Sequence, residues 1–194
     1  LNELEVTLTG RGVPLFGRVR LIHEPRALRE PERFLPALYL VQLVDACLLD
    51  ERPDPQLFDL TIGAIRLIER SPPDRLPTVL SGIEVKLPAL DRCSACNAPN
   101  RPITAIESDG APMCQLHASP QARPLSQRAI HRVRALREAK GRELPALPTD
   151  PAHGEVVHQL QHWLANGLDR SFPLRAMALG GRIRTRTDAR STRA

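Results

Sequence analysis

The segment that organises this chain carries two short motifs, Cys93-Ser94-Ala95-Cys96 and Cys114-Gln115-Leu116-His117. Together they read C-x2-C-x17-C-x2-H, a ligand spacing typical of zinc ribbons and knuckles. Each motif places two soft ligands on one tight turn, and four such ligands complete the tetrahedral shell that zinc prefers. A closed shell leaves no position for water or substrate. The spacing therefore predicts a structural zinc ion held by Cys93, Cys96, Cys114 and His117.

Other interpretations of these cysteines are weaker. Unrelated buried thiols would not be expected to place three of the four cysteines in one pair of motifs. A disulfide-stapled loop or a redox C-x-x-C motif fits the spacing less well than a metal site does. His153-Gly154-Glu155 matches the H-x-E part of a zinc deaminase signature, but that part should precede the cysteines and here it follows them. We expect His153 to begin a helix instead.

Apolar residues recur with helical spacing on both sides of the two motifs. The pattern predicts helices over residues 31–48, 53–71, 74–87, 124–141 and 152–166. Asp74 is expected to cap the third helix. The apolar residues expected to face inward on the first helix are Phe34, Leu35, Leu38, Val41 and Leu48, with Leu40, Leu43, Val44 and Cys47 widening this stripe, so that the helix is buried on more than one side. On the second helix they are Leu57, Phe58, Ile62, Ile65 and Ile68. On the helix after residue 124, the apolar side chains should face inward and the arginines outward.

Short strands are expected at two places in the chain. Residues 4–8 alternate apolar and polar side chains, and the turn at 10–12 followed by 15–22 completes a hairpin. A lone hairpin is barely stable, so this one must belong to a larger sheet or pack on helices. Between the two cysteine motifs, residues 103–106 predict a strand that ends in a turn at Asp109-Gly110.

The composition limits the classes of function. A hydrophobic content of 42% supports a real core, and no apolar run is long enough to cross a membrane, so no membrane partner is expected. Aromatic residues make up only 3%, which argues against a surface of stacking rings for RNA. Residues 121–143 hold seven arginines and lysines against two glutamates, and residues 178–194 hold five arginines against one aspartate. These basic zones could meet a phosphate backbone.

Five stretches of the sequence, taken in order, carry a family resemblance. They are Arg29-Glu30-Pro31, Ala37-Leu38-Tyr39-Leu40-Val41-Gln42-Leu43-Val44-Asp45, Pro53-Asp54-Pro55-Gln56-Leu57-Phe58, Pro88-Ala89-Leu90-Asp91-Arg92-Cys93-Ser94-Ala95-Cys96 and Gly167-Leu168-Asp169-Arg170-Ser171. Together they resemble the family of the bacterial recombination mediator RecO, over roughly residues 1–177. In that family the fourth metal ligand is usually a cysteine, and here His117 stands at its position.

The resemblance implies an α+β fold in which an N-terminal OB-type β-barrel precedes a helical domain with a zinc-ribbon or knuckle insertion. Residues 1–30 would then be the last barrel strands, with the front of the barrel absent from this chain. Residues 31–90 and 121–177 would form the two parts of the helical domain, and residues 91–120 the zinc-binding insertion. Residues 178–194 would be a basic tail, which we expect to be disordered.

The resemblance also implies a function without covalent chemistry. Members of the family bind single- and double-stranded DNA and anneal complementary strands. With RecR and single-stranded-DNA-binding protein they help to load RecA, in the cytoplasm at the nucleoid. The acidic tail of single-stranded-DNA-binding protein would dock in a groove between helices that has a basic rim.

The candidate DNA contacts are arginines and one lysine, because their side chains meet phosphate directly. They are Arg11, Arg18 and Arg20 on the hairpin, and Arg128, Arg132 and Lys140 on the helix after residue 124. The alternative is a zinc-stabilised protein–protein adaptor without direct DNA contact, favoured by the low aromatic content and the modest charge outside the tail. An enzyme is not expected, because the sequence offers no Ser/His/Asp set, no phosphate-binding glycine loop and no paired carboxylates.

Overall fold

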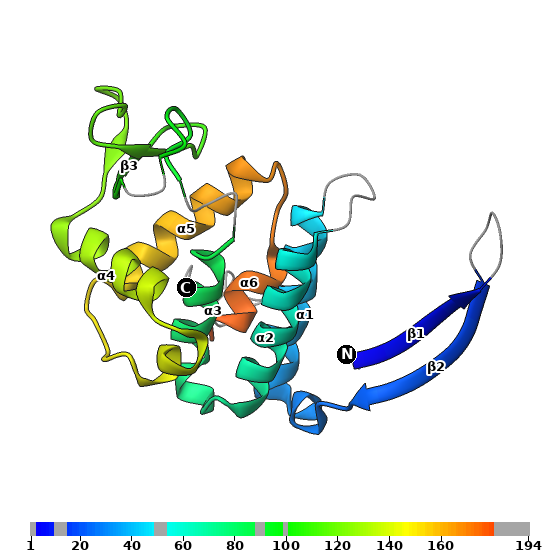
Figure 1. The fold of residues 1–194 in the computed structure, drawn as a ribbon. Helices are drawn as coiled ribbons and strands as arrows, with labels where there is room; N and C mark the ends of the chain where they lie inside the picture. The colour runs from blue at the N-terminus through cyan, green and yellow to red at the C-terminus, as the bar shows by residue number, and fades with distance from the viewer. Residues whose placement is uncertain (1–2, 10–14, 49–53, 88–91, 99–100, 181–194) are drawn as a thin grey trace, which may run out of the picture.

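The computed structural model describes residues 3–9, 15–48, 54–87, 92–98 and 101–180. Over these residues the chain is α+β, with a body of helices and two small antiparallel sheets (Figure 1). The helices are α1 (Pro31–Cys47), α2 (Pro55–Arg70), α3 (Leu76–Glu84), α4 (Gln127–Glu138), α5 (His153–Gly167) and α6 (Pro173–Ala178). Short 3-10 helices are η1 (Arg26–Arg29), η2 (Pro73–Arg75) and η4 (Gly141–Ala146).

The helix ends follow from local chemistry. The carboxylate of Asp54 accepts a hydrogen bond from the Leu57 amide at 2.9 Å and caps α2. Pro55 occupies the first position of this helix, where its missing N–H costs nothing. The Ser126 hydroxyl accepts from the Ala129 amide at 3.1 Å and caps α4. This cap places the start of α4 three residues later than the sequence predicted from Pro124. The end of α4 at Glu138 also precedes the predicted stop at Gly141.

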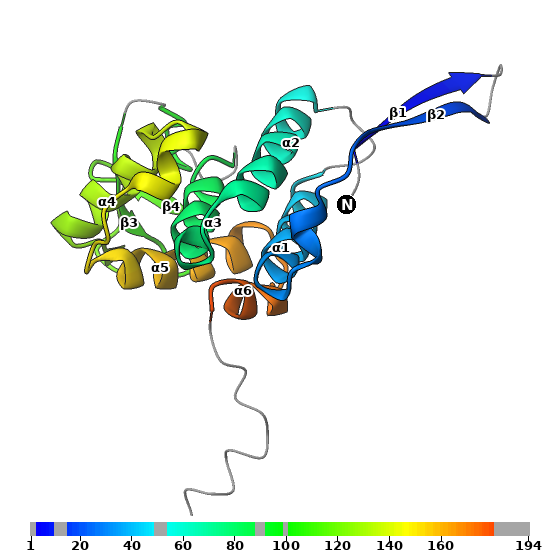
Figure 2. The ribbon, with the colours of Figure 1, turned by 90° about the horizontal axis from the view of Figure 1, so that it is seen from below.

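The core lies where α1, α2, α3 and α5 meet. Its fully buried large side chains come from every one of these helices and from α4 and η4, and they include Tyr39, Leu43, Ile68, Leu80, Leu136, Leu144, Leu160 and Leu164. Gly82 permits a close approach of α3 to η4, because a Cβ at this position would lie 2.4 Å from a methyl carbon of Leu144. Helix α6 packs beside α1 (Figure 2).

The structure corrects the expected buried residues of α1 and α2 and the expected cap of α3. Phe34 and Val41 of α1 and Leu48, just after its end, are exposed, whereas α1 buries the predicted Leu40 and Leu43 together with Ala37 and Tyr39. Because α1 is apolar on nearly every side, its sequence does not single out the buried face. Phe58 of α2 is also exposed, and Asp74 does not cap α3, since it lies inside η2 and no side chain caps α3.

The first sheet is a hairpin of β1 (Glu3–Thr9) and β2 (Leu15–His23), as the alternating pattern predicted. It projects from the helical body beyond α1 and α2 (Figures 1 and 2). His23, at the end of β2, contacts α2 through a bond of 2.8 Å between its Nε2 and Glu69 Oε2. Within the described residues this sheet has two strands and does not close into a barrel.

The second sheet lies between the two cysteine motifs and just after them. Its strand order is β4 (Pro112–Cys114), β3 (Ile103–Ile106) and β5 (Arg123–Pro124), all antiparallel. Figure 1 shows this sheet and its loops at the end of the body that carries α4 and α5. In the described part of the chain, no helix is long and apolar enough to span a membrane.

Candidate metal centre and the adjacent cavity

Four side chains predicted as metal ligands converge in the structure. One donor atom from each of Cys93, Cys96, Cys114 and His117 lies within 4.8 Å of the donor atoms of the others. Nδ1 of His117 is 3.3 Å from Sγ of Cys114 and 3.7 Å from Sγ of Cys93. A tetrahedral ion with usual zinc–sulfur and zinc–nitrogen bond lengths would separate these atoms by about 3.6 Å. The four residues could therefore hold a metal ion in a closed shell.

Backbone hydrogen bonds shape the two turns that present these ligands. The Asn97 amide donates to the carbonyl of Cys93 at 2.8 Å, and the Ala118 amide donates to the carbonyl of Cys114 at 3.1 Å. Asn97 has a φ of 51°, a left-handed conformation that asparagine tolerates better than most residues. The Ser94 amide donates to the Pro112 carbonyl at 2.9 Å, which joins the first turn to the strand that carries the second ligand pair.

Two of the three thiols in the cluster, Cys93 and Cys114, have lowered pKa values. The pKa of Cys96 is raised, because an amide hydrogen bond from Ala98 is outweighed by burial and by the neighbouring Cys93 and Cys114 thiols. Burial raises the pKa of Cys93, but amide hydrogen bonds from Cys114, Cys96 and Ala95 outweigh burial and hold that pKa at about 6. The pKa of the Cys114 thiol is also lowered: burial acts against this, but the hydrogen bond with His117 leads the groups that lower it. The same bond raises the pKa of His117. Thiolates are the form that binds metal, so this environment favours the ligand state of Cys93 and Cys114.

The second sheet connects the cluster to the helical body. Ile103 of β3 is paired in the ladder with Cys114 of β4. Farther along, the turn at Gly110 has a φ of 84°, and a Cβ there would lie 2.5 Å from Cβ of Asn166 near the end of α5. Only glycine fits both the backbone conformation and this contact. The Ser126 amide and hydroxyl donate to Glu155 of α5 at 2.9 and 2.6 Å and fix the chain after the sheet.

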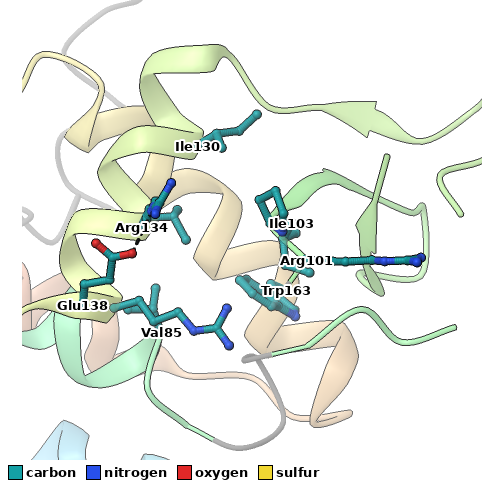
Figure 3. A pocket seen from close by; sticks show the side chains of 10 residues that line it. Val85, Arg101, Ile103, Ile130, Arg134, Glu138 and Trp163 are labelled. Atoms are coloured by element: carbon teal, nitrogen blue, oxygen red, sulfur yellow. Dashed lines mark hydrogen bonds and ion pairs between the residues drawn. The ribbon is translucent and has the colours of Figure 1, made fainter. Parts of the chain in front are cut away.

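A cavity of about 400 Å³ opens beside this sheet, between β3 and α4. Its apolar lining comes from separate segments: Val85 after α3, Ile103 on β3, Ile130 and Val133 on α4, and Trp163 on α5. Figure 3 shows Ile103 and Trp163 across the opening from Ile130 and Arg134. Trp163 is the chain's single tryptophan and is 3% exposed. Its indole N–H has no hydrogen-bond partner among the described residues.

The rim of this cavity is mainly basic. Arg134 and Arg137 come from α4 and Arg101 from the approach to β3, against the single carboxylate of Glu138. Arg134 Nε donates to Glu138 Oε1 at 2.7 Å, and the Arg101 side chain extends away from the opening in this structure (Figure 3). Lys86 lies under the rim, where its ammonium donates to the carbonyls of Arg137 and Ala139, the latter at 2.8 Å, and holds the end of α4.

The structure separates the residues predicted to contact DNA. Arg18 and Arg20 are exposed on β2, whereas Arg128 and Lys140 are exposed on and just after α4. The hairpin and α4 lie at opposite ends of the molecule in both views (Figures 1 and 2). Arg20 also pairs with Glu5 at 2.8 Å across the hairpin. Arg11 lies outside the described residues.

Arg132 corrects the expectation that all arginines of α4 face outward. It is 3% exposed, and its Nη1 donates to the Pro148 carbonyl at 3.1 Å. Burial lowers its pKa, and its Nε and Nη2 have no partner among the described residues. The helix turns Arg132 inward because Ala129 and Leu136, three and four residues away, share its face. Arg132 therefore does not present its guanidinium to a phosphate on the surface.

His153 begins α5, as predicted.

One buried polar group was missed by the sequence analysis. Glu84 of α3 is fully buried, and it accepts from Arg175 of α6 at 2.7 and 2.9 Å in a bidentate pair. The hydroxyl of Tyr39, on α1, donates to the same carboxylate. Phe172 places its ring edge-on to Tyr39, with 6.2 Å between ring centroids. The partners are 45 and 91 residues from Glu84 in sequence, so no local pattern could reveal them.

The geometry defines a class of protein: a helical α+β protein with an inserted Cys3His cluster that could hold a metal ion and a projecting hairpin. The sequence matches the family described as "Recombination protein O C terminal" over residues 28–176. The chain therefore belongs to the RecO family, as the resemblance predicted.

Two curated relatives carry the same family name. The DNA repair protein RecO of Syntrophus aciditrophicus is 34% identical over 85 residues, which cover 40% of this chain and 32% of that protein. The DNA repair protein RecO of Levilactobacillus brevis is 26% identical over 144 residues, which cover 70% of this chain and 52% of that protein. The chain thus spans between a third and about a half of the length of these relatives.

Proposed function

We propose that this protein is a non-enzymatic recombination mediator that binds DNA and promotes the annealing of complementary strands. It would act with RecR and single-stranded-DNA-binding protein in loading RecA during DNA repair, at the nucleoid. The observation that carries this proposal is the family match over residues 28–176, which contains the helices from α1 to α5 and the metal-binding insertion. The names of the two relatives, both DNA repair proteins, support the same role.

The proposed DNA contacts form two separate basic regions. Arg18 and Arg20 lie on one face of the hairpin, and Arg128 and Lys140 lie on the surface of the helical body. Annealing brings together two strands that repel each other, and arginine and lysine lower that repulsion by displacing counterions from the phosphates. Two regions at opposite ends could each hold a different segment of DNA. Contacts of this kind read the backbone and not the base sequence.

The test is annealing of complementary oligonucleotides, measured with and without single-stranded-DNA-binding protein. If about four phosphates are neutralised, the logarithm of the affinity for a single strand should fall with the logarithm of salt concentration at a slope of roughly −3. Replacing Arg128 and Lys140 by alanine should make the slope shallower by about 1.4, since each phosphate contact contributes about 0.7. Arg26→Ala, at a side chain that is 83% exposed and pairs with Glu24 outside both regions, is the control. An affinity that does not change with salt concentration would contradict direct phosphate binding.

We propose zinc as the metal of the Cys93, Cys96, Cys114 and His117 site. Three thiolates and one imidazole are the donors that zinc takes in closed structural sites. The second ligand turn is attached to a sheet with strands of four, three and two residues, which is too small to be stable alone. The ion would hold this insertion together and would take no part in chemistry. Protein purified without chelators should contain one zinc per chain, and elemental analysis finding none would contradict the assignment.

The cavity beside β3 is the proposed docking site for the acidic tail of single-stranded-DNA-binding protein. The argument is charge and shape complementarity: an apolar floor that ends at Trp163 lies beneath a rim with three arginines and one glutamate. An acidic segment with an apolar end would bury that end in the cavity and pair its carboxylates with the rim. Ile130→Asp, which places a carboxylate in the floor, should abolish tail binding, while Phe58→Asp on exposed α2 should not.

The hairpin supports a proposal about the start of the chain. Leu4, Val19 and Leu21 share one face of the hairpin and are 50 to 55% exposed, whereas Glu5, Arg18 and Arg20 share the other face. A sheet with one apolar face needs a layer or further strands to cover it. We propose that residues 1–30 belong to an OB-type barrel, followed by a helical domain at 31–90 and 121–177 that the insertion at 91–120 interrupts. Residues 181–194 of the proposed tail lie outside the described residues.

A zinc-stabilised adaptor without direct DNA contact is the second candidate. It is favoured by how the protein already uses several arginines: Arg20 pairs with Glu5, Arg134 pairs with Glu138, and Arg132 is buried. Such pairing reduces the charge that is available to phosphate. Direct titration with labelled single-stranded DNA separates the two candidates, because the adaptor should not bind it at physiological salt.

A further inference from the structure

The cavity beside β3 is assembled from two parts of the molecule that are held in different ways. One part of its lining is the strand segment 101–103, and the other part consists of Val85, α4 and Trp163. Val85 and Trp163 are 2% and 3% exposed and belong to the hydrophobic core of the helical body. The strand side belongs to the metal-binding insertion. Anything that loosens the insertion should therefore move one side of the cavity and leave the other in place.

The strand side is joined directly to the metal ligands. Ile103 is the ladder partner of Cys114, so a residue that lines the cavity lies opposite a ligand across two adjacent strands. The Ser94 amide donates to Pro112 on the same strand as Cys114, which connects the Cys93–Cys96 turn to this ladder as well. Both ligand turns are thus attached to the strand pair that forms the wall.

The strand pair is stabilised by the ligand cluster and by buried apolar contacts with the helical body. Its strands are four and three residues long, and β5 adds only two residues to its other edge. A sheet of this size is at best marginally stable in water. Metal binding to a site of this type supplies folding free energy to the segment that carries the ligands. The buried contacts of Ile103, Ile106 and Leu125 with the helical body provide the rest.

We propose that occupancy of the metal site sets the shape of this cavity, so that docking of an acidic peptide with an apolar end is coupled to metal binding. This inference rests on the docking role proposed for the cavity. With the metal bound, β3 is fixed and Ile103 faces the floor formed by Trp163. Without the metal, the wall at residues 101–103 loosens and the apolar end of the peptide loses one side of its site. Because binding couplings are reciprocal, the bound peptide should raise the affinity for the metal by the same factor.

The position of Trp163 makes the coupling measurable. It is the chain's single tryptophan and lines the cavity next to Ile103, so its fluorescence reports on the wall without a label. The full chain would be stripped of metal with a chelator and titrated with zinc alone. We expect a change in Trp163 emission that saturates at one equivalent. An emission that does not respond to zinc would overturn the inference, whatever the result with peptide.

The docking arm uses a fluorescein-labelled peptide of four aspartates followed by leucine and phenylalanine, with a free carboxylate, followed by anisotropy. We expect the affinity to fall about tenfold or more on chelation and to return with zinc, in line with typical couplings between two sites. Equal affinity with and without zinc would overturn the coupling and leave the docking site standing. Binding in neither state would overturn the docking site, and the Trp163 titration would still decide whether the metal shapes the wall.

Three variants separate the coupling from general unfolding. Cys114→Ser should abolish both responses to zinc, while the far-ultraviolet circular dichroism of the helices is retained. His117→Cys keeps four soft ligands and should preserve both responses. Cys47→Ser is the matched control, because Cys47 lies on α1, outside the cluster, and should change neither response. A Cys47→Ser protein that loses the coupling would contradict the assignment of the effect to the metal site.

Discussion

The metal-binding insertion and the helical body are stabilised in different ways. The insertion has a small sheet that buries Ile103, Ala105 and Ile106, and four side chains that could hold a metal ion converge beside it. The helical body buries large aliphatic side chains around one carboxylate, Glu84, which Arg175 and Tyr39 satisfy. In the insertion, we expect stability to depend on a bound ion. In the body it depends on contacts between helices that are distant in sequence.

This difference determines whether damage to each region should cause local or global unfolding. A local cluster of ligands is close together in sequence, so its loss should unfold only the segment that the ligands hold. The Glu84 cluster joins α1, α3 and α6, so damage to it should lower the stability of the whole body. Measurements that distinguish local from global unfolding can therefore test the comparison directly.

The largest expected effect is loss of the metal. Apparent zinc binding at sites of this type is on the order of 10–16 kcal/mol, which exceeds the whole stability of many domains. Chelation, or Cys93→Ser, should therefore unfold the insertion between residues 92 and 126. Hydrogen exchange followed by mass spectrometry should show lost protection there and retained protection in α1, α2 and α3. Loss of protection throughout the helical body would show that the two regions are not separable.

The next largest effect should come from breaking the buried ion pair. Arg175→Met leaves the Glu84 carboxylate buried without its cation, which typically costs about 3–5 kcal/mol. Urea unfolding followed by circular dichroism at the helical minimum should show this loss in the whole body. Zinc content should stay at one per chain, because the pair lies on α3 and α6 and contacts no metal ligand.

A double variant sharpens this prediction. Replacing both members, as in Glu84→Met with Arg175→Met, removes the unpaired charge and should recover much of the lost stability. If the double variant is no more stable than Arg175→Met, the cost comes from lost packing and not from an orphaned charge. The Tyr39 hydroxyl would still lose its acceptor in the double variant, so full recovery is not expected.

The same contrast explains what the sequence could predict. The ligands Cys93, Cys96, Cys114 and His117 could be identified from spacing, because each pair lies within four residues. The hairpin and the main helices followed from periodicity for the same local reason. The partnership of Glu84 with Arg175 spans 91 residues and could not. Neither could the cavity, whose lining comes from segments near residues 85, 102, 134 and 163.

The errors in the prediction also have physical causes. Helix α1 is apolar on nearly all sides, so the sequence predicted Phe34 and Val41 in the core along with Leu43, whereas the structure exposes Phe34 and Val41 and buries Ala37 and Tyr39. Arg132 was assigned to the surface because arginine is usually exposed, but its position between Ala129 and Leu136 turns it inward. Both errors arise where the tertiary arrangement overrides residue type.

A smaller effect should appear where the two regions touch. Gly110→Ala would place a Cβ 2.5 Å from Asn166 Cβ, and it would force a non-glycine residue to a φ of 84°. Left-handed backbone costs about 1–2 kcal/mol for such a residue, and overpacking adds about 1–3 kcal/mol. We expect the insertion to lose its docking on α5, which hydrogen exchange at residues 103–114 would detect. Gly154→Ala, at an open position in the first turn of α5, should leave exchange unchanged.

The smallest effect tests the connection that follows the insertion. The hydroxyl of Ser126 caps α4 through the Ala129 amide and also donates to Glu155 of α5 at 2.6 Å. Ser126→Ala removes both bonds at an exposed position, and loss of a helix cap typically costs about 1 kcal/mol. Chemical denaturation should show this small loss of stability. Zinc content should stay unchanged, because Ser126 is not one of the four clustered residues. Glu155→Gln can keep an acceptor for only one of the two Ser126 donors, but it leaves the helix cap in place, so its cost should be smaller than that of Ser126→Ala. An equal or larger cost would mean that the charge on Glu155, near the beginning of α5, contributes more than its bond to Ser126.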